Sequence, residues 1–251
     1  MTYCLEPPFR LCYLPQTDST SLHLRRMCEA GEVPEYTVVV TDQQTAGRGQ
    51  RGNTWEAEPG MNLTFSLLLA PGFVEANRQF VLSEMVSLAI KDALDEYVDG
   101  ISIKWPNDIY WHDRKIAGIL IEHGLQGSHL SWTIVGIGLN VNQQVFTSPA
   151  PNPVSLRQIL GLDTDPAALL TDILDRIRRA YEALRSGAND APYACRYFDC
   201  LFRKQTWATF ADHDGPFEGR IVRVEPSGLL VVQRRNGGER AYAFKEIQYV
   251  L

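Results

Sequence analysis

The chain has 251 residues, of which 45% are hydrophobic and 22% charged; 24 lysines and arginines against 30 aspartates and glutamates give a formal net charge of −6. These proportions are typical of globular proteins and exclude a disordered, collagen-like or disulfide-stapled chain. The length favours one large domain with a small appendage. The acidic balance argues against a dedicated nucleic-acid binder, so we expect no DNA partner.

Targeting and metal signals are weak in this sequence. No apolar run approaches the ~18 residues of a membrane span, and Glu6, Pro7 and Pro8 stand where a signal peptide would be apolar. The five cysteines form no C-x-x-C pair and the five histidines have no metal-ligand spacing. We therefore expect a cytoplasmic protein with reduced thiols, no zinc site and no membrane partner.

The first part of the chain predicts a helix, two strands and a second helix. Asp18, Ser19 and Thr20 can cap a helix over residues 18–30. Residues 36–42 and 62–70 are rich in β-branched and apolar residues and predict strands on either side of a glycine-rich segment, 43–60. Between residues 75 and 98, helical spacing joins Leu82, Met85, Val86, Ala89, Ile90, Ala93, Leu94 and Tyr97.

The remainder predicts a sheet, two helices and a small β domain. Strands are expected at 101–105, 109–111, 116–123 and 130–141, a loop at 147–153, and helices at 155–160 and 166–186. Five short strands then follow at 207–211, 217–224, 229–234, 241–244 and 247–250. We predict an α+β fold with a mixed β-sheet flanked by helices in residues 1–200, and a small C-terminal SH3-like β-barrel in residues 201–251.

Residues 47–52 match the pattern G-x-G-x-x-G, but their context excludes a dinucleotide fold. A Rossmann turn must open directly into a helix, whereas residues 53–60 are turn-prone and end in Pro59-Gly60. A Walker A loop is excluded because no Gly-Lys pair occurs in the chain. The segment is then either a loop that presents Arg48 and Arg51 to an anionic ligand or an ordinary surface turn with solvated arginines.

The segment 104–108 (Lys-Trp-Pro-Asn-Asp) has the composition of a β-turn, yet a turn does not explain Lys104. Strand alternation puts Lys104 on the face opposite the apolar side chains, where a lysine is costly unless it meets an anion. Asn107 and Asp108 offer oxygen ligands suited to Mg²⁺ beside phosphates. Downstream, Gly136 and Gly138 interrupt a strand and mark either a bulge or the close approach of a ligand.

Taken together and in order, five segments resemble the biotin–protein ligases. They are residues 18–20, residues 44–49 with Trp55 and 62–63, and residues 104–108, 115–122 and 136–140. The resemblance implies a two-step reaction with ATP and biotin as substrates and Mg²⁺ as cofactor. Biotin and ATP form biotinyl-5′-AMP and pyrophosphate, and a lysine of the biotin carboxyl carrier domain of a biotin-dependent carboxylase then takes the biotinyl group and releases AMP.

The resemblance also implies roles for individual residues. Lys104 and Arg48 would be catalytic and would contact the biotin carboxylate and the α-phosphate. The biotin site would comprise Ser19, Thr20, Gln44, Gly47, Arg48, Lys104, Gly118, Gly136 and Gly138. The ATP and adenylate site would comprise Arg48, Arg51, Trp55, Asn107, Lys115 and Asn140. Magnesium would lie at Asn107 and Asp108, and residues 44–60 would close over the adenylate to exclude water.

Departures from the family pattern and rival functions complete these expectations. Gln50 and Asn53 stand where the best-studied bacterial form of the motif has additional arginines, which leaves open how tightly the loop retains the adenylate. Too few residues precede Asp18 for a helix-turn-helix domain, so we expect a ligase without repressor function. Monomer and homodimer both agree with the resemblance. The rivals are a lipoyl or octanoyl transferase of related fold, and a module that binds biotin or nucleotide without catalysis.

Overall fold

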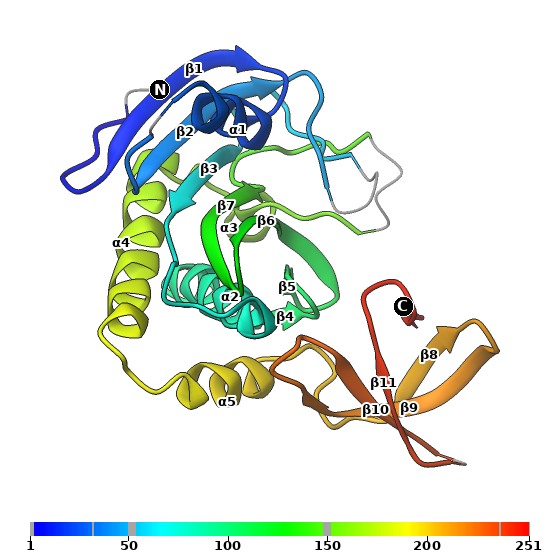
Figure 1. The fold of residues 1–251 in the computed structure, drawn as a ribbon. Coiled ribbons are helices and arrows are strands. Elements are labelled where there is room, and N and C mark those ends of the chain that lie inside the picture. Colours follow the sequence, from blue (N-terminus) through cyan, green and yellow to red (C-terminus); the bar gives the residue numbers. More distant parts are fainter. Residues whose placement is uncertain (1–2, 32, 50–53, 148–151, 236, 251) are drawn as a thin grey trace.

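The computed structural model describes residues 3–31, 33–49, 54–147, 152–235 and 237–250, and its chain forms two β-sheets with helices packed around the larger one (Figure 1). The first half contains β1 (Arg10–Thr17), α1 (Thr20–Ala30), β2 (Thr37–Gln44), β3 (Leu63–Leu69), the 3₁₀ turn η2 (Ala76–Arg78), α2 (Phe80–Leu94), β4 (Ile101–Lys104) and β5 (Asp108–Trp111). The second half contains β6 (Arg114–Gln126), β7 (His129–Leu139), α3 (Leu156–Leu160), α4 (Pro166–Arg185), α5 (Ala191–Asp199), β8 (Ala208–Asp212), β9 (Gly215–Val224), β10 (Leu230–Arg234), β11 (Glu239–Tyr242) and β12 (Gln248–Tyr249).

The larger sheet has seven strands in the order β1-β2-β3-β7-β6-β5-β4. β1 runs parallel to β2, and every other neighbouring pair is antiparallel. In the middle of the sheet, β6 and β7 place Gly118 directly opposite Gly138, and β3 places Ser66 opposite Gly136. The prediction of an α+β fold with a mixed sheet flanked by helices is confirmed.

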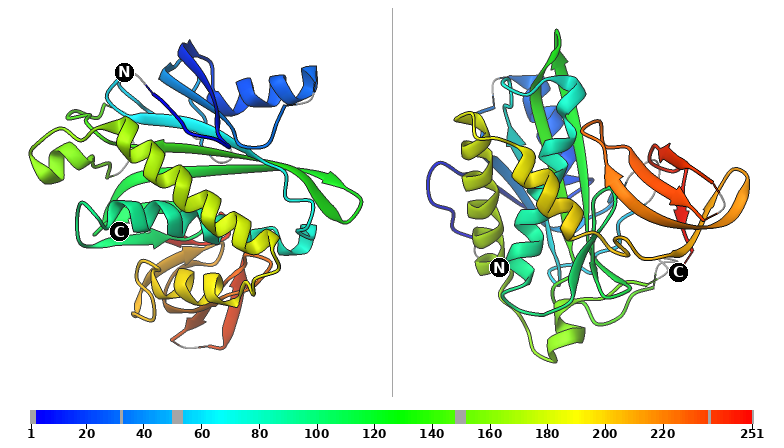
Figure 2. Two further views of the ribbon diagram at one scale, coloured as in Figure 1. Left: turned by 90° about the vertical axis from the view of Figure 1, so that its left-hand side faces the viewer. Right: turned by 90° about the horizontal axis from the view of Figure 1, so that it is seen from below.

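The two faces of this sheet have different chemistry because side chains alternate along each strand. One face carries apolar residues such as Phe65, Val135 and Ile137 and packs against α2 and α4 in the main core. The other face is covered near β2, β3 and β7 by α1, which lies on the side of the sheet away from α4 (Figure 2). That second face also carries Ser66, Gly136 and Gly138, so it offers small and polar groups where α1 begins.

The predicted helices are present, and two of them, α3 and α4, have side-chain caps at their N-termini. The apolar stripe of α2 is buried as predicted, except for Tyr97, which lies beyond the end of the helix and is exposed. At α4, Pro166 takes the first position and the Asp165 side chain accepts a hydrogen bond from the Ala167 N–H. α3 has a capping box formed by Ser155 and Gln158.

Two elements of the large domain were not predicted. β1 is an edge strand whose residues are only partly buried, and it contains Pro15, so it lacks the apolar alternation of a central strand. α5 has nine residues, of which only Tyr197 is fully buried. Both elements depend on tertiary packing, β1 on the backbone of β2 and α5 on α2.

The smaller sheet has five antiparallel strands in the order β11-β10-β9-β8-β12. All five strands overlap the predicted ones, and β9 and β11 each begin two residues earlier than expected. Within the described residues the pairings form an open sheet with β11 and β12 at its edges. The C-terminal β-structure is therefore confirmed, and its closure into an SH3-like barrel stays a prediction.

The C-terminal sheet is attached beside the turn between β4 and β5 (Figure 1). The chain after α5 pairs with β4, where the Ile103 N–H donates to the carbonyl of Cys200 at 2.8 Å. The Trp105 indole N–H donates to the Gly228 carbonyl at 2.9 Å. The two sheets are thus joined next to Lys104, at the end of β4.

Two further sequence expectations concern the membrane and the thiols. Within the part of the chain that the structure describes, we find no helix with both the length and the apolar character that crossing a membrane requires. All five cysteines are free.

Candidate functional site

A cavity of about 1070 Å³ opens on the α1 side of the large sheet and is bordered by the C-terminal sheet. Residues 244 and 245 and residues 247–249 of the C-terminal sheet line one of its sides. Most of the predicted site residues line this cavity: Ser19, Thr20, Gln44, Arg48, Trp55, Lys104, Asn107, Asp108, Lys115, Gly118, Gly136, Gly138 and Asn140. The structure therefore brings together residues that the sequence scatters over more than a hundred positions.

A cluster of hydroxyl groups lies where α1 begins. The Thr20 backbone N–H donates to Gln44 Oε1 at 2.9 Å, and Thr20 Oγ1 lies 2.8 Å from Ser66 Oγ. Ser21 Oγ lies 2.9 Å from the same Ser66 oxygen. Ser19 is the N-cap residue, but its hydroxyl makes no capping hydrogen bond. The cluster can both donate and accept hydrogen bonds, which suits a neutral polar ligand group.

Gly136 makes room for this cluster. A Cβ at position 136 would lie 2.4 Å from Ser21 Oγ, so any side chain there would displace the hydroxyl. Ser21 and Ser66 were not among the predicted site residues, because isolated serines carry no sequence signal; only the pairing of β3 with β7 brings Ser66 to Gly136.

Trp55 lies against two glycines of the sheet. A Cβ at Gly138 would be 2.3 Å from Trp55 Cε2, and a Cβ at Gly118 would be 3.1 Å from Trp55 Cζ3. The indole ring therefore fills the space that side chains would take on neighbouring strands. Its Nε1 is buried and has no hydrogen-bond partner within the described residues. An aromatic face beside a small-residue floor suits a planar ligand ring.

Lys104 projects into the cavity from the end of β4. Its Nζ lies 3.0 Å from the Tyr110 hydroxyl oxygen, and 4.8 Å and 5.1 Å from the ring centres of Tyr110 and Tyr249. Burial lowers the pKa of the Lys104 ammonium, and the nearby Asp108 carboxylate partly offsets this. Among the described residues no carboxylate pairs directly with Lys104, so its charge is available to an anion in the cavity.

Asp108 and Lys115 form an ion pair beside Lys104, with Lys115 Nζ 2.6 Å from Asp108 Oδ1. Lys115 Nζ also lies 5.8 Å from the centre of the Trp55 ring. The neighbouring Asn107 is buried, and its side-chain N–H donates to the Ile119 carbonyl, so it fastens the β4–β5 turn to β6. Asp108 offers a partly exposed carboxylate at the cavity, which fits the single-carboxylate attachment that Mg²⁺ uses when phosphate oxygens complete its shell.

The side-chain amide of Asn140 has a hydrogen-bond partner for its nitrogen and none, within the described residues, for its oxygen. Its Nδ2 donates to the Val154 carbonyl at 3.0 Å, which orients the side chain. Its Oδ1 is buried and has no partner within the described residues. Since a buried unpaired acceptor costs about 1–3 kcal/mol, this oxygen fits a ligand that brings an N–H group into the cavity.

The glycine-rich loop is described only in part. Arg48 is exposed, and its backbone bridges to Thr54. Gly47 packs so closely on the following chain that a Cβ would lie 2.6 Å from the Trp55 carbonyl oxygen. The predicted contacts of Arg51 and the effect of Gln50 and Asn53 lie outside the described residues. Loop closure over a ligand stays a prediction.

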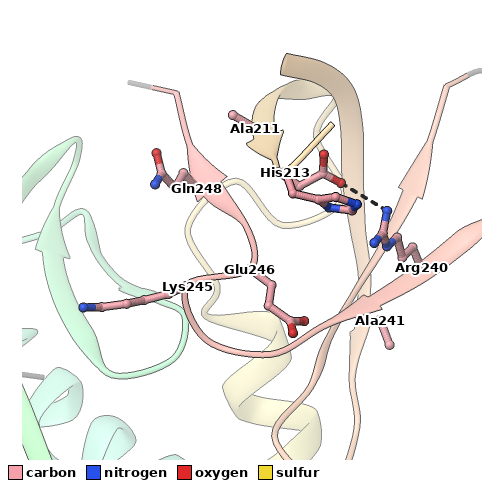
Figure 3. A pocket seen from close by; sticks show the side chains of 8 residues that line it. Ala211, His213, Arg240, Ala241, Lys245, Glu246 and Gln248 are labelled. Atoms are coloured by element: carbon pink, nitrogen blue, oxygen red, sulfur yellow. Dashed lines mark hydrogen bonds and ion pairs between the residues drawn. The ribbon is translucent and has the colours of Figure 1, made fainter. Parts of the chain in front are cut away.

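A second cavity, of about 610 Å³, lies within the C-terminal sheet (Figure 3). Asp212 and His213 line it, and their ligand atoms and that of the neighbouring Asp214 all lie within 4.8 Å of one another. The Asp212 carboxylate is fully buried and already has cationic partners, Arg234 at 3.0 Å and Arg240 at 3.5 Å. Because two guanidinium groups take the place of a cation, we assign this cluster to the packing of the sheet.

Comparison with known proteins adds independent evidence. The family model described as "Biotin/lipoate A/B protein ligase family" matches residues 13–140. The biotin–[acetyl-CoA-carboxylase] ligase of Paracoccus denitrificans is 34% identical over 235 residues, which cover 88% of this chain and 92% of that protein. The bifunctional ligase/repressor BirA of Bacillus subtilis is 29% identical over 84% of this chain, and the match spans 65% of the relative's length.

The fold has a counterpart among solved structures. The biotin protein ligase of Aquifex aeolicus, in complex with biotin and ATP, superimposes with a TM-score of 0.79 and 27% sequence identity. The match covers 96% of this chain and 99% of that one. It therefore includes both sheets.

Proposed function

This chain belongs to the biotin/lipoate A/B protein ligase family, and we propose that it attaches biotin to a lysine of a carrier protein in an ATP-dependent reaction. The observation that carries this proposal is the composition of the large cavity. One cavity combines a hydroxyl cluster, an aromatic ring on a glycine floor and a lysine with no carboxylate partner among the described residues. The structure of the Aquifex relative is a complex with biotin and ATP.

The hydroxyl cluster is the proposed site of the biotin ring system. Ser19, Thr20 and Gln44 would hydrogen-bond the ureido group, which both donates and accepts. Gly136 would let the bicyclic ring approach the sheet, since no side chain projects there. Gly118 and Gly138, also predicted for the biotin site, are covered by the Trp55 ring, and Gly47 packs on the Trp55 backbone. These three glycines would therefore act on biotin only through the position of Trp55. In this arrangement the carboxylate at the end of biotin's acyl chain would point towards Lys104.

The other end of the cavity is the proposed nucleotide site. Trp55 would stack on the adenine, and the unpaired Asn140 Oδ1 would accept a hydrogen bond from the exocyclic amine. Arg51 and Lys115 would meet the phosphates. Asp108 would hold Mg²⁺ together with phosphate oxygens, and the ion would supply neutralisation of their charge. Asn107, predicted as a second ligand, would contribute mainly by fixing the turn that carries Asp108.

The chemistry follows from the charges in the cavity. A carboxylate oxygen of biotin forms a bond to the α-phosphorus of ATP, the bond from that phosphorus to the bridging oxygen breaks, and pyrophosphate leaves. Both reactants are anions, so cations must offset their repulsion; Lys104 and Arg48 would do so by contacting the carboxylate and the α-phosphate. Charge-assisted hydrogen bonds of this kind contribute roughly 1.5–3 kcal/mol each.

The second step uses the mixed anhydride as an acyl donor. A neutral lysine amine of the carrier attacks the acyl carbon, the acyl–oxygen bond to AMP breaks, and AMP leaves with the electron pair. The nitrogen loses its proton to solvent as the amide forms. We propose the biotin carboxyl carrier domain of a biotin-dependent carboxylase as acceptor. We also propose that residues 1–200 form the catalytic domain and residues 201–251 an SH3-like C-terminal domain; the cytoplasmic location and a monomeric or homodimeric state stay predictions.

An incorporation assay tests the proposal. Purified chain is incubated with ATP, Mg²⁺ and an acceptor carrier domain, with either biotin or lipoate, and the mass of the carrier is measured. Mass gain with biotin alone supports the proposal; gain with lipoate alone assigns the chain to the lipoate branch, and no gain with either identifies a binding module.

Replacement of Lys104 tests the assigned chemistry. Lys104→Ala is expected to lower biotin-dependent pyrophosphate release by at least 100-fold, because the ammonium contacts both anions in the transition state, and to leave the melting temperature close to that of the wild type. Lys91→Ala is the matched control, since Lys91 lies on α2 and pairs with Asp95 outside the cavity. Near-normal release by Lys104→Ala would contradict the role.

A further inference from the structure

The last strand of the C-terminal sheet brings an aromatic ring to the lysine of the large sheet. Tyr249, in the two-residue strand β12, lies with its ring centre 5.1 Å from Lys104 Nζ. Tyr110 of β5 lies with its ring centre 4.8 Å from the same atom, and its hydroxyl oxygen is 3.0 Å away. Lys104 is thus held by two tyrosines, one from each sheet.

Tyr249 is fixed in this position by aromatic packing. Its ring centre lies 5.1 Å from that of Phe210, its partner across the β8–β12 pairing, and 6.1 Å from that of Phe202. Phe202 in turn packs on Tyr110 at 5.5 Å. A continuous aromatic cluster therefore connects the C-terminal sheet to both residues that contact Lys104.

The Tyr249 hydroxyl does not explain why a tyrosine packs here. Its oxygen is buried without a hydrogen-bond partner within the described residues. A buried unpaired hydroxyl destabilises a fold, so the hydroxyl gives no reason for a tyrosine at this position. The contact between Tyr249 and Lys104 is made by the aromatic ring. The face of an aromatic ring attracts an ammonium within about 6 Å of its centre, and more strongly where water is excluded.

We propose that Tyr249 is a positioning residue for the adenylation step: together with Tyr110 it holds the Lys104 ammonium towards the place where carboxylate and α-phosphate meet. This inference rests on the proposed function. A lysine side chain has four rotatable carbon bonds, and an unheld ammonium would spend much of its time away from the reacting atoms. The position of the C-terminal sheet is thereby coupled to the first chemical step.

The ring also favours the charged form of the lysine. The charged groups that face Lys104 are Asp108 on β5, Lys115 on β6 and Arg203 after α5; Asp108 raises the pKa of the ammonium, and the other two lower it. These groups, with the neutral phenol of Tyr110, are unchanged when Tyr249 is replaced. Loss of the ring alone is expected to lower the pKa of Lys104 and to move the alkaline limb of the rate–pH profile to lower pH.

Two substitutions separate the ring from the hydroxyl. Tyr249→Phe keeps the ring and removes the unpaired hydroxyl, so single-turnover pyrophosphate release and its pH profile are expected to match the wild type, with equal or higher stability. Tyr249→Leu keeps an apolar side chain without a π face. Its release rate is expected to fall about 3- to 30-fold, and its alkaline limb to move down by about 0.5 to 1 pH unit.

Phe217→Leu is the matched control, because Phe217 packs on Phe210 in the same sheet without lining the large cavity, and its release rate is expected to stay near the wild type. A second measurement needs no activity: reductive methylation of Lys104, followed against pH by peptide mass mapping, reports its pKa in each full-length variant. Equal rates, pH limbs and methylation profiles in wild type and Tyr249→Leu would overturn the inference. Absence of biotin-dependent release in the wild type would instead refute the proposed function, and the methylation profiles would still decide whether Tyr249 holds Lys104.

Discussion

Replacing Gly138 by alanine tests the proposed stacking of adenine on Trp55 most sharply. Gly138 lies on β7 opposite Gly118, in backbone that alanine can adopt, so the substitution adds one methyl group and no backbone strain. That methyl group would lie 2.3 Å from Trp55 Cε2 and 2.5 Å from Trp55 Nε1. Carbon atoms in contact need about 3.5–4.0 Å, so the indole ring must leave its place.

The size of the effect follows from packing energies. Forcing an extra methyl group into a filled site costs about 1–3 kcal/mol, and stacking of a base on an aromatic side chain contributes a similar amount. If displacement of Trp55 is passed on to nucleotide binding, the KM for ATP is expected to rise about 5- to 150-fold. The KM for biotin is expected to change less, because the hydroxyl cluster contacts Gly136 and not Gly138.

The assay is biotin-dependent pyrophosphate release at varied ATP. Gly72→Ala is the control, since the nearest atom to a Cβ there is 3.9 Å away. A double-mutant cycle with Trp55→Ala shows whether the effect passes through the ring: Gly138→Ala should add little once the indole is gone. An unchanged KM for ATP in Gly138→Ala would refute this account of adenine stacking. So would an equal rise in KM for ATP when Gly138→Ala is added to the wild type and to Trp55→Ala.

Two further predictions concern biotin and stability. Gly136→Ala places a Cβ 2.4 Å from Ser21 Oγ and is expected to raise the KM for biotin more than that for ATP, measured in the same assay; the opposite order would contradict the placement of the biotin ring. Burial raises the pKa of Glu84 on α2 from 4.5 to about 7, so the stability that its protonated form contributes is lost as the pH rises from about 4.5 to about 7. Glu84→Gln is therefore expected to stabilise the fold by roughly 3 kcal/mol at pH 8 and by little at pH 5, and equal changes in urea unfolding at both pH values would exclude this.

Elements with strong local periodicity were predictable from the sequence. The stripe from Leu82 to Leu94 predicted α2 because each apolar residue in it faces the same core. β1 and α5 were not predicted because neither has a clear apolar periodicity of its own. Each is stabilised by packing against another element, β1 against β2 and α5 against α2. The end of the chain shows the same limit: β12 has only two residues, and its pairing with β8 is what positions Tyr249.

The candidate site was predictable as a set of residues but not as an arrangement. Motif resemblance indicated Gly118, Gly136 and Gly138, yet the reason for each glycine is a contact with a distant side chain, Trp55 or Ser21. These contacts depend on the register of strands that are distant in the sequence. That register is set by the pairing of the whole sheet and cannot be read from any one segment.

Biotin-dependent exchange of labelled pyrophosphate into ATP tests the central claim most directly, because it requires only the reversible first step and no carrier protein. We predict exchange that depends on biotin and Mg²⁺, is not supported by lipoate, and is lost in Lys104→Ala but not in Lys91→Ala. No exchange with biotin in the folded wild-type chain, or equal exchange in Lys104→Ala, would contradict the account.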